Sequence, residues 1–354
     1  MELLENTQRR ITARSEEWAQ HAHQRLASLT MPYWALGRVL DLAEELAAMT
    51  RSMSPPVSRK AVAVMAGDHG VTAEGVSRYP SEVTRQMVLN FLHGGAAINA
   101  LARQANAEVY VVDMGIAEPL NNYSDNAKLI SHRIAAGTGN IAKEPAMTRE
   151  QAIASIEAGI ETASYLGAET DIFATGDMGI GNTTPSTGVL AALTGASVED
   201  ITGRGTGLED DQLAHKTSVI KRALQHNSPD AHDPVDVLAK VGGFEIGGIA
   251  GLILGAAAQQ KPVLLDGFIS TAGALLAKNL KREAADYMIA AHRSVEQGHT
   301  AMHEDLGKLP LLDLQLRLGE GTGAALAMSL VDAAACALTD IATFEEAAVS
   351  EETG

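Results

Sequence analysis

The stretch that decides the fold is Ala174-Thr175-Gly176-Asp177-Met178-Gly179-Ile180-Gly181-Asn182-Thr183-Thr184-Pro185. It follows the β-forming pair Ile172-Phe173, and Thr184 and Pro185 suit the N-cap and the first turn of a helix. The glycines between them allow positive φ and a close approach of a ligand to the backbone. The unpaired N–H groups of a helix start favour an anion such as phosphate by about 0.3 to 2 kcal/mol. The alternative is that the glycines only let a helix pack closely on a sheet.

Strand-like and helix-like segments alternate on both sides of this stretch. The run Lys60-Ala61-Val62-Ala63-Val64-Met65-Ala66 is continuously apolar, which is typical of a buried parallel strand, and further strands are predicted at 108–113 and 262–268. Helices are predicted at 148–166, 210–224 and 324–338, with two more within 7–49, of which the second is 34–49. The alternation predicts an α/β fold with one main body.

Composition limits the kinds of partner. The chain has 354 residues, with 27 Lys and Arg against 44 Asp and Glu, a net charge of −17. This charge opposes binding to nucleic acid or to an anionic membrane surface, so a small-molecule partner is expected. No uncharged apolar segment reaches about 18 residues, and the start of the chain lacks the pattern of a signal peptide. The single cysteine, Cys336, lies in an apolar run and is expected to be a buried thiol, which suits a reducing cytoplasm.

Three further sites carry candidate chemistry. A second glycine turn, Gly203-Arg204-Gly205-Thr206-Gly207, precedes Lys216, whose cation could reach a phosphate. Asp68 and His69 directly follow the first strand, where ligand crevices often form, although a turn-capping Asp is an equal alternative. In Leu318-Gly319-Glu320-Gly321 a carboxylate stands between glycines, either as a base held close to a ligand or as an exposed turn residue.

Other well-known motifs fit poorly. The segment from Gly179 to Thr184 has Thr where a dinucleotide fingerprint has its third glycine, and the loop lacks the Gly-Lys-Ser/Thr ending of a nucleotide-triphosphate loop. His299 and His303 are four residues apart, as metal ligands on a helix can be, but the Glu of a metalloprotease motif is missing. No metal and no cofactor are therefore predicted.

Several motifs together resemble one family, the nicotinate-nucleotide:dimethylbenzimidazole phosphoribosyltransferases of cobalamin biosynthesis. The resemblance covers nearly the whole chain. It comprises, in family order, Gly67-Asp68-His69-Gly70-Val71, Tyr79-Pro80-Ser81-Glu82-Val83-Thr84, Gly94-Gly95-Ala96-Ala97-Ile98-Asn99, the central loop, the second glycine turn, Asp266-Gly267-Phe268 and Leu318-Gly319-Glu320-Gly321-Thr322-Gly323.

This resemblance implies an architecture and a set of site residues. It implies a large domain at 58–290 with a parallel sheet and helices on both faces, a small helical domain built from 1–57 and 291–354, and a homodimer. Glu320 matches the family's general base, and Asp177, where the family more usually has Glu, is a second catalytic candidate. Phosphate and ribose contacts are implied for Gly176, Met178, Gly179, Ile180, Gly181, Asn182, Gly205 and Lys216. The benzimidazole pocket is implied for Tyr79, Pro80, Ser81, Gln86 and Leu318.

The implied reaction moves phosphoribose from nicotinate mononucleotide to 5,6-dimethylbenzimidazole. A pyridinium leaving group departs without protonation, so the protein must chiefly remove the azole N–H proton, which one carboxylate can do. Two alternatives remain. One is another N-ribosyl transferase or phosphorylase, and the other is a sensor of a phosphorylated metabolite, in which Glu320 would have no task.

Overall fold

The computed structural model describes residues 2–205 and 207–350. Thr206 in the second glycine turn and the end of the acidic C-terminal tail lie outside the described residues. The main sheet has six strands in the order β3-β2-β1-β4-β5-β6, and every neighbouring pair is parallel. The strands are β1 (Lys60–Gly67), β2 (Ala107–Gly115), β3 (Leu129–Ser131), β4 (Ile172–Met178), β5 (Val263–Leu265) and β6 (Met288–Ala290). The predicted α/β fold is confirmed.

The strand order reverses between β1 and β4, which places a crevice at their carboxyl ends. Ala66 of β1 lies opposite Met178 of β4, so Asp68 and His69 leave the sheet beside the central loop. In open parallel sheets, ligands bind at such a switch point because the connections leave on opposite faces there. Sheet topology alone therefore predicts a ligand site at the carboxyl ends of β1 and β4.

Helices cover both faces of the sheet. Side chains alternate between faces along a strand, and Val62 and Met65 of β1 lie on opposite sides. Val62 lies against Gly321 at the start of α14 (Thr322–Thr339), whereas Met65 lies against Gly248 of α11 (Phe244–Ala257). On the α11 side, α6 (Arg149–Gly167) crosses so closely that a Cβ on Gly251 would lie 1.8 Å from the Ile156 carbonyl oxygen. Glycine is required at that crossing.

The remaining elements include further helices that pack on the sheet and others that pack on the helices covering it. They are η1 (Gly70–Glu74), α4 (Glu82–Leu92), α5 (Ala97–Gln104), η2 (Asn121–Tyr123), α7 (Thr183–Thr194), α8 (Val198–Ile201), α9 (Asp210–Asn227), α10 (Pro234–Val241), α12 (Phe268–Leu280), η3 (Arg282–Tyr287) and α13 (His299–Leu306). The short strands β7 (His292–Ser294) and β8 (Leu312–Leu316) form a separate parallel pair.

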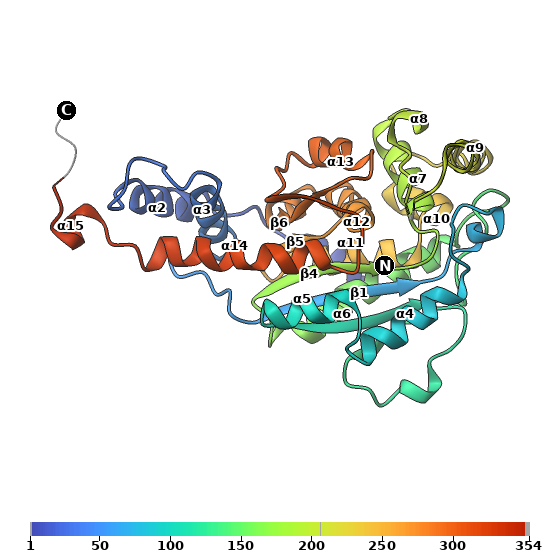
Figure 1. Cartoon of the computed structure of the whole chain (residues 1–354), viewed down its shortest axis with the longest axis horizontal. Helices are drawn as coiled ribbons and strands as arrows, with labels where there is room; N and C mark the ends of the chain where they lie inside the picture. Colours follow the sequence, from blue (N-terminus) through green and yellow to red (C-terminus); the bar gives the residue numbers. More distant parts are fainter. Residues whose placement is uncertain (1, 206, 351–354) are drawn as a thin grey trace.

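The two ends of the chain lie together. The helices α2 (Glu16–Ala27) and α3 (Arg38–Thr50) pack against α14, which runs lengthwise from the sheet towards them (Figure 1). A β-bridge joins Leu29 to Thr343 just before α15 (Phe344–Ala347). Helices α2 and α3 are the two helices predicted within 7–49, but the predicted start of the second at residue 34 was wrong, because α3 begins only after Gly37, which has φ +48°. The separate helix α1 (Glu2–Arg10) was not predicted.

Helix α14 has 18 residues and a mean hydropathy of 1.5, and within the described ranges it is the one helix that is long and apolar enough to cross a membrane. It includes the charged Asp332, so it is not an uncharged apolar segment of the kind that the sequence lacks. Because 61% of it is buried against the rest of the protein, its apolar character fits a core helix. The prediction that Cys336 is a buried thiol was wrong: Cys336 lies on the outward face of α14 and is exposed, because the helix turns the neighbouring Ala335 and Ala337 inward instead.

Candidate active site

The central loop is shorter than the sequence predicted. Strand β4 continues through Gly176 and Asp177 to Met178, and α7 begins at Thr183 with Asn182 as its N-cap. The prediction of Thr184 as the N-cap was wrong. Gly181, with φ +85°, makes the turn. The N–H of Thr184 donates to the carbonyl of Gly181 at 3.0 Å, so Thr184 already lies inside the helix.

The loop lies directly on the end of β1 and on α4. A Cβ on Gly179 would lie 2.4 Å from the Gly67 carbonyl oxygen, so this position requires glycine. The N–H of Ile180 donates to the hydroxyl of Thr84 on α4 at 3.1 Å. These contacts fix the path of the loop at the switch point.

Glu320 lies in a turn of unusual backbone geometry. Gly319, Glu320 and Gly321 have φ of +83°, +64° and +94°, all in the left-handed region. For a non-glycine residue this conformation costs on the order of 1–3 kcal/mol and is typical of functional sites. The turn lies over β4, because a Cβ on Gly176 would lie 2.6 Å from the Glu320 carbonyl oxygen. The Glu320 side chain is buried, and its Oε2 accepts from the N–H of Ile98 at 3.3 Å.

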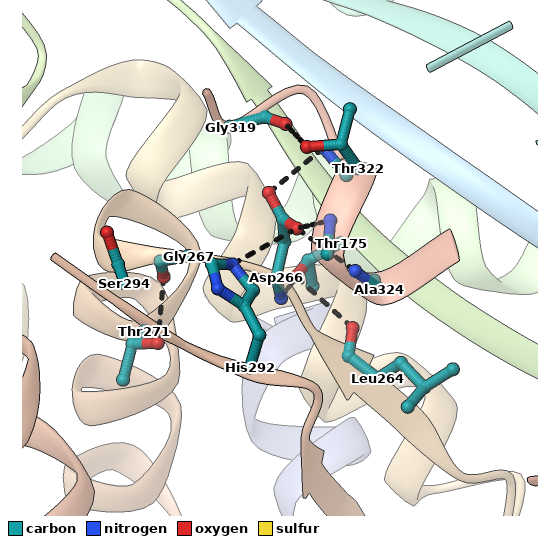
Figure 2. A network of polar contacts seen from close by, with 12 residues as sticks. Thr175, Leu264, Asp266, Gly267, Thr271, His292, Ser294, Gly319, Thr322 and Ala324 are labelled. Atoms are coloured by element: carbon teal, nitrogen blue, oxygen red, sulfur yellow. Dashed lines mark hydrogen bonds and ion pairs between the residues drawn. The ribbon is translucent and has the colours of Figure 1, made fainter. Parts of the chain in front are cut away.

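Asp266, directly after β5, holds this turn from below (Figure 2). Its Oδ2 accepts from the N–H of Gly321 at 3.0 Å, and its Oδ1 accepts from Gly323 at 2.7 Å and Ala324 at 3.1 Å. His292 lies beside it, with Nε2 3.7 Å from Oδ1. The carboxylate therefore caps α14 from a distant part of the chain, where the dipole of the helix favours negative charge.

Buried carboxyl groups gather at this end of the site. Burial raises the pKa of Glu320, the N–H of Ile98 opposes the shift, and nearby Asp266 adds to it. Burial likewise raises the pKa of Asp177 well above its usual range, helped by the charges of Asp266 and Glu245. Like charges in a low-dielectric site favour protonation of one partner. Glu320 has the raised basicity that suits a general base, and Asp177 favours the neutral acid.

Asp177 lies between the loop and the turn. Asn182 donates to its Oδ2 at 3.1 Å, while its Oδ1 is buried and has no hydrogen-bond partner in the described part of the chain. A Cβ on Gly319 would lie 3.2 Å from Oδ2, so the carboxyl group touches the Glu320 turn. The structure therefore brings together the two carboxyl residues that the sequence singled out.

Lys216 on α9 is fully buried, unlike most lysines. Its Nζ donates to the hydroxyl of Thr183 at 2.7 Å and to the Gly203 carbonyl at 3.2 Å, and a Cβ on Gly205 would lie 3.5 Å from it. Burial lowers the pKa of Lys216 to about 8, against the opposing effect of Glu296. Because Thr183 is the first residue of α7, the cation and a helix N-terminus converge on one place. This arrangement suits a phosphate group.

Asp68 and His69 both lie at the site edge and are buried. His69 Nε2 lies 2.8 Å from Glu245 Oε1. Burial alone would lower the pKa of His69, but the charge and the hydrogen bond of Glu245, together with the charge of Asp68, outweigh it, so the pKa is raised. Asp68 Oδ2 accepts from the N–H of Ala117 at 2.8 Å. His69 supports the loop from beneath, since a Cβ on Gly179 would lie 3.1 Å from its ring.

The residues implied for the benzimidazole pocket are less closely joined. Tyr79, Pro80 and Ser81 lie just before or at the start of α4, Gln86 lies within it, and all four are exposed. In residues 2–205 and 207–350, none of them forms a hydrogen bond or ion pair with the central loop or with the 319–321 turn. Leu318 is exposed beside Gly319. Thr84, between Ser81 and Gln86, joins this segment to the central loop through its hydrogen bond with the N–H of Ile180.

Sequence reasoning missed four residues of the site: Thr183, Glu245, His292 and Glu296. Glu245 had a detectable signal, because it is the one charge in the apolar glycine-rich segment 242–258. Asp266 belongs to the motif Asp266-Gly267-Phe268, but nothing in the sequence indicated its role. The other residues carry no local pattern, since only the fold brings them near Lys216 or Asp266.

His299 and His303 lie side by side, with ring centroids 4.1 Å apart. His299 already uses both nitrogens, with Nε2 2.9 Å from the Thr271 hydroxyl and Nδ1 accepting from the N–H of Ser294 at 2.8 Å. Within the described ranges, no group of three or more His, Cys, Asp or Glu residues is arranged to hold a metal ion.

Comparisons with known proteins agree with this geometry. A family model described as phosphoribosyltransferase matches residues 11–349, and the chain belongs to this family. A nicotinate-nucleotide--dimethylbenzimidazole phosphoribosyltransferase of Syntrophotalea carbinolica is 60% identical over 99% of both chains. One of the same description from Desulfotalea psychrophila is 54% identical over 99% of both chains. The crystal structure of CobT from Thermus thermophilus is 47% identical, with a TM-score of 0.91 over 95% of this chain and 100% of that one.

Proposed function

We propose that the protein transfers the 5-phosphoribosyl group of nicotinate mononucleotide to 5,6-dimethylbenzimidazole, giving α-ribazole 5′-phosphate and nicotinate for the lower ligand of cobalamin. The observation that carries this proposal is the buried Glu320 carboxylate, presented by a strained turn at the switch point. The relatives named for this reaction, which match almost the full chain, support it.

In the proposed reaction, an azole ring nitrogen attacks C1′ of the ribose with its lone pair. The bond from C1′ to the pyridinium nitrogen breaks, and its electron pair leaves with nicotinate. Attack from the face opposite the leaving group converts the β linkage to α. Glu320 accepts the proton of the other azole nitrogen, which we expect to contribute about 10²- to 10⁴-fold in rate. No step requires a metal or a covalent enzyme intermediate.

The remaining site residues have binding roles in this proposal. Lys216 and the N-terminus of α7 hold the 5′-phosphate, and Asp177 lies beside the ribose as a neutral hydrogen-bonding acid. The phosphate and ribose lie along Gly176, Met178, Gly179, Ile180, Gly181, Asn182 and Gly205. The azole lies between Leu318 and the group Tyr79, Pro80, Ser81 and Gln86, whose exposed side chains leave room for it.

We further propose the division into domains at 58–290 and at 1–57 with 291–354, a homodimer, and a cytoplasmic location. The packing of α14 on α2 and α3 supports the division. Val295, Leu309, Leu314 and Leu318 are exposed near β7 and β8, and such an apolar surface supports self-association. Light scattering at micromolar concentration tests the dimer, and a monomeric mass would contradict it.

Product analysis tests the function. The purified protein is incubated with nicotinate mononucleotide alone, with 5,6-dimethylbenzimidazole, and with phosphate. We expect release of nicotinate that depends on the azole, together with α-ribazole 5′-phosphate. Hydrolysis or phosphorolysis without the azole would point to another ribosyl enzyme, and binding without turnover would point to a sensor. Turnover that a chelator abolishes and one metal restores would contradict the metal-free chemistry.

A further inference from the structure

The carboxylate of Asp266 is fully buried and lies outside the set of residues that bind substrate in the proposal above. It accepts three backbone N–H groups, from Gly321, Gly323 and Ala324, at the residue after Glu320 and the start of α14 (Figure 2). Helix α14 cannot supply this cap itself, because its own N-cap residue is Gly321, which has no side chain. One carboxylate therefore joins the helix start to the left-handed turn.

Asp266 is itself fixed to the sheet. Its N–H donates to the hydroxyl of Thr175 on β4 at 3.1 Å, and that hydroxyl lies 3.3 Å from the Leu264 carbonyl on β5. Thr175 also precedes Gly176, over which the Glu320 carbonyl lies. The path from the sheet through Thr175 and Asp266 to Gly321 is thus an unbroken series of hydrogen bonds that ends one residue from Glu320.

We propose that Asp266 is a positioning residue for Glu320: its carboxylate holds the 319–321 turn in the left-handed conformation that aims the Glu320 side chain at the azole. This inference rests on the proposed function, since it takes Glu320 as the base. Asp266 touches no reacting atom, and its positioning role acts through the turn, separately from the charge that raises the pKa of Glu320. The opposite case is a carboxylate that stabilises α14 without affecting the chemistry.

Asp266→Asn separates these two roles. The amide oxygen of Asn can keep accepting from Gly323 and Ala324, which preserves the helix cap. Its NH2 group then faces the N–H of Gly321, so this one bond is lost and the turn is released. We expect kcat to fall about 10- to 100-fold, because small displacements of a catalytic group are costly, while KM for nicotinate mononucleotide changes less than about threefold.

A double-mutant cycle with Glu320→Gln gives the decisive readout. If Asp266 acts through Glu320, Asp266→Asn should cost almost nothing further once the base is gone, so the double variant should match Glu320→Gln within about threefold. The defect of Asp266→Asn should also shrink with a more acidic azole, such as a benzimidazole with an electron-withdrawing substituent. Equal fold losses in the presence and absence of the Glu320 carboxylate would overturn the proposal, and so would an unchanged kcat in Asp266→Asn.

Thr175→Val provides a second route if Asp266→Asn does not fold. It keeps the volume of the side chain and the charge of Asp266, and removes only the hydroxyl that fixes the Asp266 backbone. We expect a smaller kcat loss, about three- to tenfold, that also disappears in the Glu320→Gln background. Because the carboxylate remains, this variant excludes loss of negative charge beside Glu320 as the cause. A loss that persists in that background would count against the proposal.

Asp113→Asn is the matched control. Asp113 is a buried carboxylate at the end of β2, and its Oδ1 accepts from the N–H groups of Gly115 at 3.0 Å and Ile116 at 2.9 Å. We expect it to lower Tm, with any loss of kcat the same for all azoles and unaffected by Glu320→Gln. If Asp113→Asn reproduced the azole dependence, the effect would not be specific to the turn. Failure of the proposed function is distinguishable, because it appears as absent product in the unmodified protein and takes this inference with it.

Discussion

The two ends of the site hold their charged groups in opposite ways. Glu320 has a short side chain on a backbone turn, and Asp266 accepts from Gly321 in that turn and from Gly323 and Ala324 at the start of α14. The Glu320 side chain is itself held, because its Oε2 accepts from the N–H of Ile98. Lys216 instead reaches its place through a long flexible chain, and among the described residues its Nζ donates to one hydroxyl and one carbonyl. The acidic end, which holds Glu320, fixes the direction in which the carboxylate points. The basic end, which holds Lys216, supplies a positive charge whose orientation matters less.

This difference corresponds to different demands of the proposed reaction. A proton acceptor works only when it is aligned with the N–H bond in the transition state, so its loss should lower kcat. A phosphate contact is the same in the ground state and the transition state, so its loss should raise KM. The acidic and basic ends should therefore be separable by kinetics.

Glu320→Gln should give the largest effect. It keeps the size and most of the polarity of the side chain and removes the proton acceptor. We expect kcat to fall by roughly 10² to 10⁴ in steady-state assays, with little change in the binding of nicotinate mononucleotide. The defect should shrink when the azole is supplied largely as its anion, at higher pH or with a more acidic azole.

Exposed Glu17 on α2 offers a control far along the chain, and Glu17→Gln should leave both constants unchanged. Near-normal turnover of Glu320→Gln with dimethylbenzimidazole would remove Glu320 from the chemistry. The contrast between the two ends would then have no kinetic meaning.

Lys216→Met should change KM for nicotinate mononucleotide, in contrast to Glu320→Gln, which should change kcat. Methionine fills most of the buried volume and removes the charge, so the loss of one charge-assisted contact of about 1.5–3 kcal/mol should raise KM for nicotinate mononucleotide about 10- to 100-fold. We expect kcat to change much less. Lys221→Met, which replaces an exposed lysine of the same helix, should leave KM unchanged.

The pH dependence of KM sharpens this test. Burial lowers the pKa of Lys216 to about 8, so the free protein loses this charge as pH rises through that value. KM of the unmodified protein should therefore rise above about pH 8, and Lys216→Met should abolish that rise. A collapsed kcat with an unchanged KM would exclude Lys216 from the phosphate site.

Much of the fold could be predicted because its signals are local. The continuous apolar run at 60–66 indicates a buried parallel strand, and the glycines around Asp177 mark a strand-to-helix turn, as the structure has them. Periodicity could not place the start of α3 or the exposure of Cys336, because the turn at Gly37 and the rotation of α14 depend on packing between the two ends of the chain.

The site was only partly predictable for a similar reason. Glycines on both sides of Glu320 signal an unusual turn, but nothing near Asp266 in the sequence shows that it accepts bonds from residues 55 to 58 positions away. Likewise, the burial of Lys216 follows from the meeting of α7 and α9, and a lysine on a helix gives no local sign of it. Long-range hydrogen bonds carry the information that the local pattern lacks.

Asp177→Asn should give the smallest effect, and it tests whether Asp177, the second carboxyl group at the acidic end, must carry a charge. Burial and the neighbouring carboxylates raise the pKa of Asp177, which favours its neutral acid, and asparagine is a neutral side chain of the same shape. Its amide oxygen can accept from Asn182 as Oδ2 does, and its NH2 group takes the place of Oδ1, which has no partner among the described residues. We expect kcat and KM within about threefold of the unmodified protein, whereas Asp177→Ala, which loses both polar atoms, should lower kcat further. Steady-state kinetics of the two variants side by side measure the difference. If Asp177→Asn were as inactive as Glu320→Gln, both carboxylates would have to carry charge in the step. The acidic end would then act as a pair, and alignment of Glu320 alone would no longer account for the contrast with Lys216.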